Sequence, residues 1–388
     1  MPKNIVILFD GTSNEISADR SNVLRLYGML EKSERQLVYY DPGVGTIGPE
    51  NAWLRFWRKA VEIWGMATGW GLDRNVKEAY RFLVENYDKG KRKGDNPAGR
   101  DAIYIFGFSR GAYSARVLAG FIHAVGLIEK RNLNLLDYAY RAYKRIGENA
   151  EDSFAEVRLY ERILDPDRPP IRLLGLFDTV ASVIEHGRYG PRLRSHAFTQ
   201  KNRSVESVRH AVGIDERRTM FRPLLWPEGE EYWGNPFNRA AARQQDVREV
   251  WFTGTHGDIG GGYPEEESGL AKITLNWMVE ETRPMGLSYR TQTVNEILLG
   301  KNPGKLYVAP DPLAPLHNPM NWAWALLEFI PCFRPAGSKR PALLGLTIPL
   351  FARRTIPEGA RVHRTVIERA EALGEKPPNL TAAYSIEE

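Results

Sequence analysis

The sequence has a single cysteine, Cys332, among its 388 residues. An intramolecular disulfide and a zinc site built on cysteines are therefore both excluded. The chain also lacks a basic N-terminal stretch followed by an apolar run and a small-residue cleavage site. No apolar run reaches the roughly 20 residues that a membrane-spanning helix needs. We expect synthesis in the cytoplasm without a transmembrane segment, and export, if any, by a route that reads no N-terminal signal.

Several motifs of cofactor and metal chemistry are also absent. The chain has no P-loop and no H-E-x-x-H, so we expect no cofactor and no metal. A cation held jointly by Asp10, Asp178 and Asp258 is the one alternative, because each of these residues follows a predicted strand. "GVGTIG" at 43–48 fits a dinucleotide-binding pattern, but the acidic end of a second strand that should follow it is missing.

Charge gives little information about partners. Lys and Arg number 53 against 48 Asp and Glu, a net charge of +5. So small and diffuse an excess does not indicate a nucleic-acid site. The densest basic run, "KGKRKG" at 89–94, precedes a strand and is predicted to be a solvated loop. We expect no nucleic-acid partner.

Short apolar runs alternate with segments of helical periodicity. Strands are predicted at 5–9, 36–40, 102–108, 171–177 and 247–255, and helical segments at 75–87 and 115–127. This alternation predicts an α/β protein with a mostly parallel central sheet flanked by helices. We expect a catalytic core at 1–285, with a helical insertion at about 128–170, and a C-terminal cap or extension at 286–388 packed on that core.

A candidate nucleophile follows the third predicted strand. Residues 107–111, "GFSRG", fit G-x-S-x-G between a predicted strand and a predicted helix. In that context the serine sits on a sharp turn, and glycines at Gly107 and Gly111 let the neighbouring backbone approach. We expect Ser109 to be the nucleophile. The alternative is a serine that only caps the helix.

A serine hydroxyl needs a histidine to remove its proton and an acid to orient that histidine. His256 is the candidate base, because it follows a strand in the glycine-rich loop "THGDIGGGY". His186, after "FDTV", could contact the substrate. Asp178 is the candidate acid, in the Ser…Asp…His order of α/β-hydrolases. Asp258 is the alternative acid, and otherwise a brace of the His256 loop.

The opening "FDGT" also suggests a phosphatase with a catalytic aspartate. That chemistry needs D-x-D-x-T, and its first aspartate is replaced here by Leu8. Asp10 is therefore predicted to anchor a turn. The backbone N–H groups of Arg110 and of Gly11 or Thr12 are the expected oxyanion donors. The side chain of Arg110 either faces a substrate phosphate or is solvated.

Taken together, these segments resemble a family of uncharacterised α/β-hydrolases that includes the phospholipase effectors of bacterial type VI secretion. The resemblance rests on "FDGTSN", "YYDPGVGT", "GFSRGAYSAR", "GLFDTVAS", "RHAVGIDERR", "GTHGDIGGGY" and the later "IPEGARVHRTVIERA". It departs at Ser13, where the family commonly has tryptophan. The resemblance implies an α/β-hydrolase fold, a Ser109–Asp178–His256 triad and an esterase or lipase. In secreted members the implied substrates are glycerophospholipids.

Two aromatic-rich segments, at 53–66 and 318–333, bear on the substrate. They suit an interfacial lid or acyl groove, and equally the interior of a cap. The expected partners are an ester or phospholipid, a membrane surface, and a secretion or immunity protein. Two alternatives remain: a non-lipolytic esterase of small soluble esters, and a catalytically silent hydrolase-like binding module.

Overall fold

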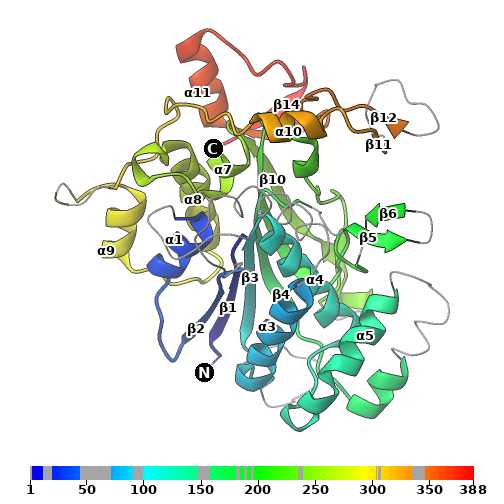
Figure 1. Ribbon diagram of the computed structural model, residues 1–388. Helices are drawn as coiled ribbons and strands as arrows, with labels where there is room; N and C mark the ends of the chain where they lie inside the picture. Colours follow the sequence, from blue (N-terminus) through cyan, green and yellow to red (C-terminus); the bar gives the residue numbers. More distant parts are fainter. Residues whose placement is uncertain are drawn as a thin grey trace, which may run out of the picture.

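An eight-stranded sheet in which every strand pairing is parallel forms the centre of the protein (Figure 1). A computed structural model describes residues 2–11, 20–43, 71–90, 99–146, 158–180, 184–187, 190–193, 196–234, 239–302, 304, 307–333 and 346–388. The strand order is β14 (Tyr384–Glu387), β13 (Ala360–His363), β10 (Asp246–Phe252), β7 (Val205–Gly213), β4 (Ile171–Phe177), β3 (Ala102–Phe108), β1 (Asn4–Phe9) and β2 (Gln36–Asp41).

Helices cover both faces of this sheet. The α-helices are α1 (Asn22–Met29), α3 (Leu72–Asn86), α4 (Arg110–Val125), α5 (Leu136–Ile146), α7 (His256–Gly260), α8 (Gly269–Thr282), α9 (Thr291–Thr293), α10 (Trp322–Leu327) and α11 (Arg364–Leu373). Short 3-10 turns are η1 (Lys130–Leu135), η2 (Thr219–Phe221), η3 (Arg239–Ala241) and η4 (Glu265–Glu267), and η5 (Val294–Leu298) is a π-helix. Among the described residues, three antiparallel pairs lie outside the sheet: β5 (Ile184–Gly187) with β6 (Gly190–Leu193), β8 (Glu231–Tyr232) with β9 (Arg243–Gln244), and β11 (Cys332–Phe333) with β12 (Leu346–Thr347).

The protein has three layers, a sheet with helices on each face, because successive side chains along each strand point to opposite faces. In β1, Ile5 and Ile7 join the hydrophobic core under α3, α4 and α5, whereas Val6 and Leu8 join the core under α1 and α8. A strand buried on both faces has to be apolar throughout, which is why these strands appear in the sequence as continuous apolar runs. The predicted α/β-hydrolase-like fold, with its mostly parallel sheet flanked by helices, is confirmed.

The C-terminal segment enlarges the sheet. β13 pairs with β10, and β14 pairs with β13, so residues after 346 form one edge of the sheet. A third core cluster joins this edge to the rest through Trp251, Val362 and Val366. The separation of 1–285 from 286–388 stays a prediction, as does the insertion at 128–170, within which η1 and α5 lie.

Candidate active site

Ser109 lies on a strained turn between β3 and α4. Its backbone has φ 58° and ψ −121°, and α4 begins at the next residue, Arg110. A non-glycine residue in the left-handed region costs free energy and persists only where the surroundings hold it. The Ser109 N–H donates to the carbonyl oxygen of Phe177 at 3.0 Å, which ties the turn to the end of β4.

Glycines make room for this turn. A Cβ on Gly107 would lie 2.4 Å from the carbonyl oxygen of Gly111, and a Cβ on Gly111 would lie 2.3 Å from that of Phe9. A Cβ on Gly260 would lie 1.9 Å from a ring atom of Phe108. Gly107, Gly111 and Gly260 thus permit close packing between β1, β3, α4 and α7.

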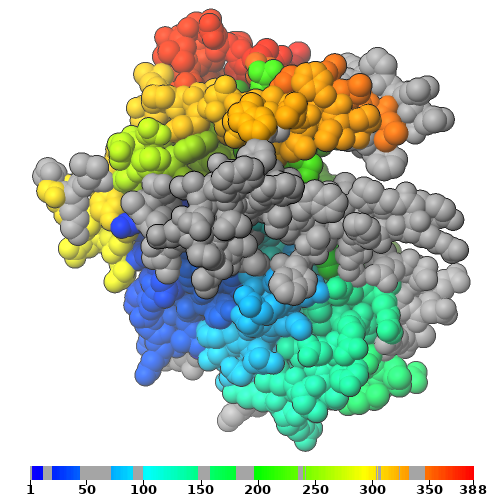
Figure 2. Space-filling view, in the orientation of Figure 1, coloured from blue at the N-terminus to red at the C-terminus, as the bar shows by residue number. Residues whose placement is uncertain are grey.

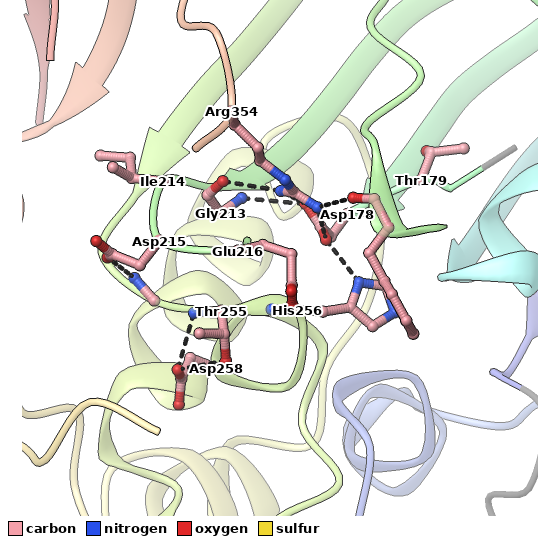
Figure 3. A network of polar contacts seen from close by, with 12 residues as sticks. Asp178, Thr179, Gly213, Ile214, Asp215, Glu216, Thr255, His256, Asp258 and Arg354 are labelled. Carbon is pink, nitrogen blue, oxygen red and sulfur yellow. Dashed lines mark hydrogen bonds and ion pairs between the residues drawn. The ribbon is translucent and has the colours of Figure 1, made fainter. Parts of the chain in front are cut away.

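A chain of hydrogen bonds joins the predicted serine, histidine and aspartate. His256 Nε2 lies 2.8 Å from Ser109 Oγ, and His256 Nδ1 lies 2.5 Å from Asp178 Oδ2. The three side chains are buried, and Asp178 is 0% exposed. They come from the ends of β3 and β4 and from the start of α7, where Figure 3 shows His256 pointing towards Asp178.

Protonation follows from these contacts. Burial would raise the pKa of Asp178, but the charge of Arg354 and the hydrogen bonds from His256 and Arg354 outweigh it, so the pKa lies well below its usual range. An ionised carboxylate only accepts, so Nδ1 of His256 carries the proton and Nε2 accepts from the Ser109 hydroxyl. Burial lowers the pKa of His256 despite its bond to Asp178, which favours the neutral imidazole.

Sequence reasoning missed Arg354, whose guanidinium binds both oxygens of Asp178. Nη1 donates to Oδ1 at 2.6 Å and Nη2 to Oδ2 at 2.8 Å (Figure 3). The Gly213 N–H, at the end of β7, adds a bond of 3.1 Å. Arg354 lies in "FARRTIPEG", a stretch without a recognisable motif, so no local signal could have revealed it.

Glu216 is a second residue that was missed. It accepts from the backbone N–H of His256 at 3.1 Å and from Arg218 Nη2 at 2.8 Å. Burial opposes ionisation, yet the hydrogen bond and charge of Arg218 lower the pKa of Glu216 to about 2. Glu216, in the loop that follows β7, therefore fixes the position of the histidine backbone.

Asp10, directly after β1, joins the end of this strand to β2 and to the start of α1. This buried carboxylate accepts from Ser21 Oγ at 2.5 Å, from Tyr40 Oη at 2.8 Å and from the N–H of Gly11 at 2.6 Å. The Gly11 N–H, one of the expected oxyanion donors, is thus bonded to Asp10 here. Thr12, the other candidate, lies outside the described residues, and the oxyanion role stays a prediction.

Asp258 lies beside His256 but contacts other groups. It accepts from the N–H and hydroxyl of Thr255 at 2.8 and 2.9 Å, which caps α7. Its other oxygen lies 2.5 Å from Nδ1 of His317, and Nε2 of His317 lies 3.0 Å from Glu267. Both ring nitrogens of His256 are occupied by Ser109 and Asp178, so Asp258 holds the loop rather than the imidazole.

Aromatic side chains pack around His256. The rings of Phe108 and Phe221 lie 4.8 and 4.7 Å from its imidazole, and Trp324 on α10 lies 5.3 Å from Phe221. Glu328, after α10, accepts from the N–H and hydroxyl of Thr219 at 2.6 and 2.7 Å. The segment around α10 is therefore attached to the turn that adjoins the histidine.

Several of the sequence predictions fall outside the described part of the chain. They concern Thr12, Ser13, the side chain of His186, most of "GVGTIG" at 43–48, the segment at 53–66 and most of "KGKRKG". In the described ranges, no three metal-binding side chains are grouped. Over those same ranges, no helix combines the length and the apolar character needed to cross a membrane.

The fold and the buried serine–histidine–aspartate chain define a protein of the α/β-hydrolase-like class. Within that class, the chain belongs to the family described as the type VI secretion system phospholipase effector Tle1-like catalytic domain, whose family model matches residues 3–281.

The chain is 33% identical over 240 residues to the uncharacterized protein YEL023C of Saccharomyces cerevisiae, an alignment that covers 58% of this chain and 33% of that protein. The chain thus spans about a third of that relative's length.

Two solved structures are also similar. An uncharacterized protein from Pseudomonas aeruginosa shares 21% identity at a TM-score of 0.40, over 79% of this chain and 49% of that one. The Tle1 effector bound to the VgrG spike of the type 6 secretion system shares 20% identity at a TM-score of 0.31, over 69% and 52% of the two chains.

We expect Gly111→Ala to destabilise the protein by about 1–3 kcal/mol or more, since its Cβ would meet backbone oxygens that cannot rotate away. Gly28→Ala is the matched control, because that helical glycine has only a side-chain atom at 3.6 Å and alanine favours helix. Denaturant unfolding measures both variants. Equal stability of the two would contradict the packing argument.

We expect His317→Gln to destabilise the protein more at about pH 6 than at about pH 9. Partial burial lowers the pKa of His317, but Asp258 and Glu267 raise it above its ordinary value overall. A raised pKa stabilises the fold fully below the unfolded-state value of about 6.5, and this stabilisation is lost as pH rises through the folded-state value. Denaturant midpoints of the wild type and the variant at both pH values measure the loss of stability. An equal loss at the two pH values would refute the charged pairing of His317 with Asp258 and Glu267.

Proposed function

We propose that the chain is a serine hydrolase that cleaves carboxylic esters through an acyl-enzyme. The observation that carries this proposal is the hydrogen-bonded chain Ser109–His256–Asp178, buried at the carboxyl edge of a parallel sheet. Active sites of open α/β sheets lie at that edge. Membership of a family described by its phospholipase effectors supports a lipolytic reaction.

The reaction proceeds in two steps. His256 Nε2 takes the proton of Ser109 as its Oγ attacks the ester carbonyl, and Asp178 stabilises the imidazolium that forms. His256 then gives the proton to the departing alcohol, which leaves an acyl-serine. Water, deprotonated by the same imidazole, attacks this acyl group; the bond to Ser109 Oγ breaks, His256 returns the proton to Oγ, and the acid is released. Asp178 accepts hydrogen bonds throughout and takes no proton.

The negative oxygen formed during attack needs donors beside Ser109. The N–H of Arg110 opens α4, where the helix dipole favours negative charge. A second donor would come from the turn after β1, which Asp10 holds. A Cβ on Gly111 would lie 2.4 Å from the carbonyl oxygen of Asp10, so this turn adjoins the start of α4. We assign the second donor to Gly11 or Thr12; Gly11 would have to leave Asp10.

We propose glycerophospholipids as the substrates and a membrane surface as the place of reaction. The family description names phospholipase effectors. The segment around α10 exposes Trp322 (64%), Leu326 (61%), Phe329 (56%) and Ile330 (55%) beside the site, and Figure 2 shows α10 in orange at the surface. Large exposed apolar patches mark interaction sites. A secretion or immunity protein partner belongs to the same proposal.

Ser109→Ala should reduce turnover of a p-nitrophenyl ester by at least about 10³-fold and abolish labelling by a fluorophosphonate probe, because it removes the nucleophile. Ser114→Ala, in the helix α4 that follows Ser109, is the matched control and should keep both the turnover and the labelling. Comparable turnover in Ser109→Ala and the wild type, or no labelling of Ser109 in the wild type, would refute the serine-hydrolase proposal.

The double variant Trp322→Ser/Leu326→Ser should bind phospholipid vesicles at least about ten-fold more weakly than the wild type. Each substitution removes exposed apolar area that the bilayer would bury. Vesicle sedimentation measures binding, and mass spectrometry of the products gives the bond cleaved. Leu373→Ser, which removes a 55% exposed leucine at the end of α11, is the control. Equal binding by both variants would place the membrane contact elsewhere, and cleavage of soluble short esters alone would count against a phospholipase.

A further inference from the structure

Arg354 binds the Asp178 carboxylate through both of its terminal nitrogens. Its two terminal nitrogens reach one carboxylate oxygen each, at 2.6 and 2.8 Å. The same nitrogens also donate to the carbonyl oxygens of Gly213 at 2.8 Å and of Phe221 at 2.5 Å. Arg354 is 6% exposed. A bidentate guanidinium fixes the plane of a carboxylate as well as its charge.

The backbone conformation of residues 350–354 places the Arg354 side chain beside Asp178. Leu350 and Phe351, just before it, have φ 47° and 60°, two consecutive non-glycine residues in the left-handed region. Asn379 donates to the carbonyl oxygens of Arg354 at 3.0 Å and of Ile214 at 3.1 Å. Backbone strain of this kind persists where the surroundings over-determine it. The turn before β13 is thus held in the conformation that carries Arg354 to the sheet.

The Asp178–His256 pair has few other charges around it in the described residues. Glu216 and Arg218, on the loop after β7, face His256 and pair with each other. His210 on β7 faces Asp178, and its Nδ1 lies 2.8 Å from Glu249. Asp258, on α7 itself, is bonded to Thr255 and His317. Arg354 is therefore the cation that binds the Asp178 carboxylate directly.

We propose that Arg354 is a positioning residue of the active site: it holds the Asp178 carboxylate ionised, turned towards His256 and balanced in charge. This inference rests on the proposed serine-hydrolase function. Arg354 touches neither Ser109 nor a substrate in this arrangement, and it acts through Asp178. It lies beyond residues 3–281, which the family model matches, so the segment after 346 completes the site.

Replacing Arg354 by a neutral residue should shift the apparent pKa of the Asp178–His256 pair in one direction. Removing a positive charge beside the coupled Asp178–His256 pair favours proton uptake, so the apparent pKa of the pair rises. The ester hydrolysis rate depends on the neutral imidazole, and its acid limb would move to higher pH. A role in packing alone would lower stability or kcat without moving that limb.

The experiment compares Arg354→Gln, which is neutral, and Arg354→Lys, which keeps the charge but not the fork, with Arg353→Met, an exposed neighbour. The readouts are kcat/KM against pH on a soluble p-nitrophenyl ester and the NMR titration of His256, followed at its Nδ1 proton. Fluorophosphonate labelling of the wild type tests the proposed function separately, and the NMR titration tests Arg354 whether or not labelling occurs.

For Arg354→Gln we expect kcat/KM to fall about 10- to 100-fold at neutral pH, and both the acid limb and the His256 titration to move up by about one pH unit. Arg354→Lys should leave the acid limb in place and lower kcat/KM less than Arg354→Gln does. In an Asp178→Asn background, Arg354→Gln should lower kcat/KM little further, because the arginine acts through that carboxylate.

A folded Arg354→Gln with an unmoved limb and an unmoved His256 titration would overturn the proposal, as would an undiminished further loss in the Asp178→Asn background. Should Arg354→Gln fail to fold, Arg354→Lys decides. A kcat/KM loss of at least about five-fold with an altered Nδ1 resonance supports the proposal, and behaviour equal to Arg353→Met overturns it.

Discussion

The carboxylate of Asp178 imposes the main constraint on this structure. It is fully buried and ionised, and a buried charge left without a partner costs about 3–5 kcal/mol. Its donors come from three separate parts of the chain: Gly213 at the end of β7, His256 at the start of α7, and Arg354 in the C-terminal segment. Because these donors have to meet at one point, the end of β7, the helix α7 and the sheet edge are positioned relative to one another.

The parallel sheet makes that meeting feasible. The carboxyl ends of its strands all lie on the same side of the sheet. The turns after β3, β4 and β7 and the loop after β10 therefore lie next to one another, although they are distant in sequence. Two of the turns carry strain, with φ 58° at Ser109 and 41° at Asp178. Both are held by backbone bonds to the neighbouring strand, from Ser109 to Phe177 and from Asp178 to Ala211. The ladder thus supports the conformation that projects each side chain over the edge.

Local patterns made part of this architecture predictable. The strands at 5–9, 102–108 and 171–177 are continuous apolar runs, because both of their faces are buried. By contrast, β7 includes Arg209 and His210, buried polar residues satisfied by Glu281, Asp246 and Glu249, and such a run does not read as a strand. G-x-S-x-G and the loop of His256 identify themselves by their glycines, whereas Arg354 depends on a distant contact that no spacing encodes.

The C-terminal segment belongs to the folding unit of the site. Without it, β10 would become an edge strand with unpaired backbone groups, and Trp251 and Val212 would lose the partners Val362 and Val366. Asp178 would keep the Gly213 N–H and His256 but would lose its cation. His317 and Glu328 attach the same region to Asp258 and to Thr219, on the segments that flank His256. A core ending near residue 285 would therefore contain the serine, histidine and aspartate and still leave their charge and one sheet edge unsatisfied.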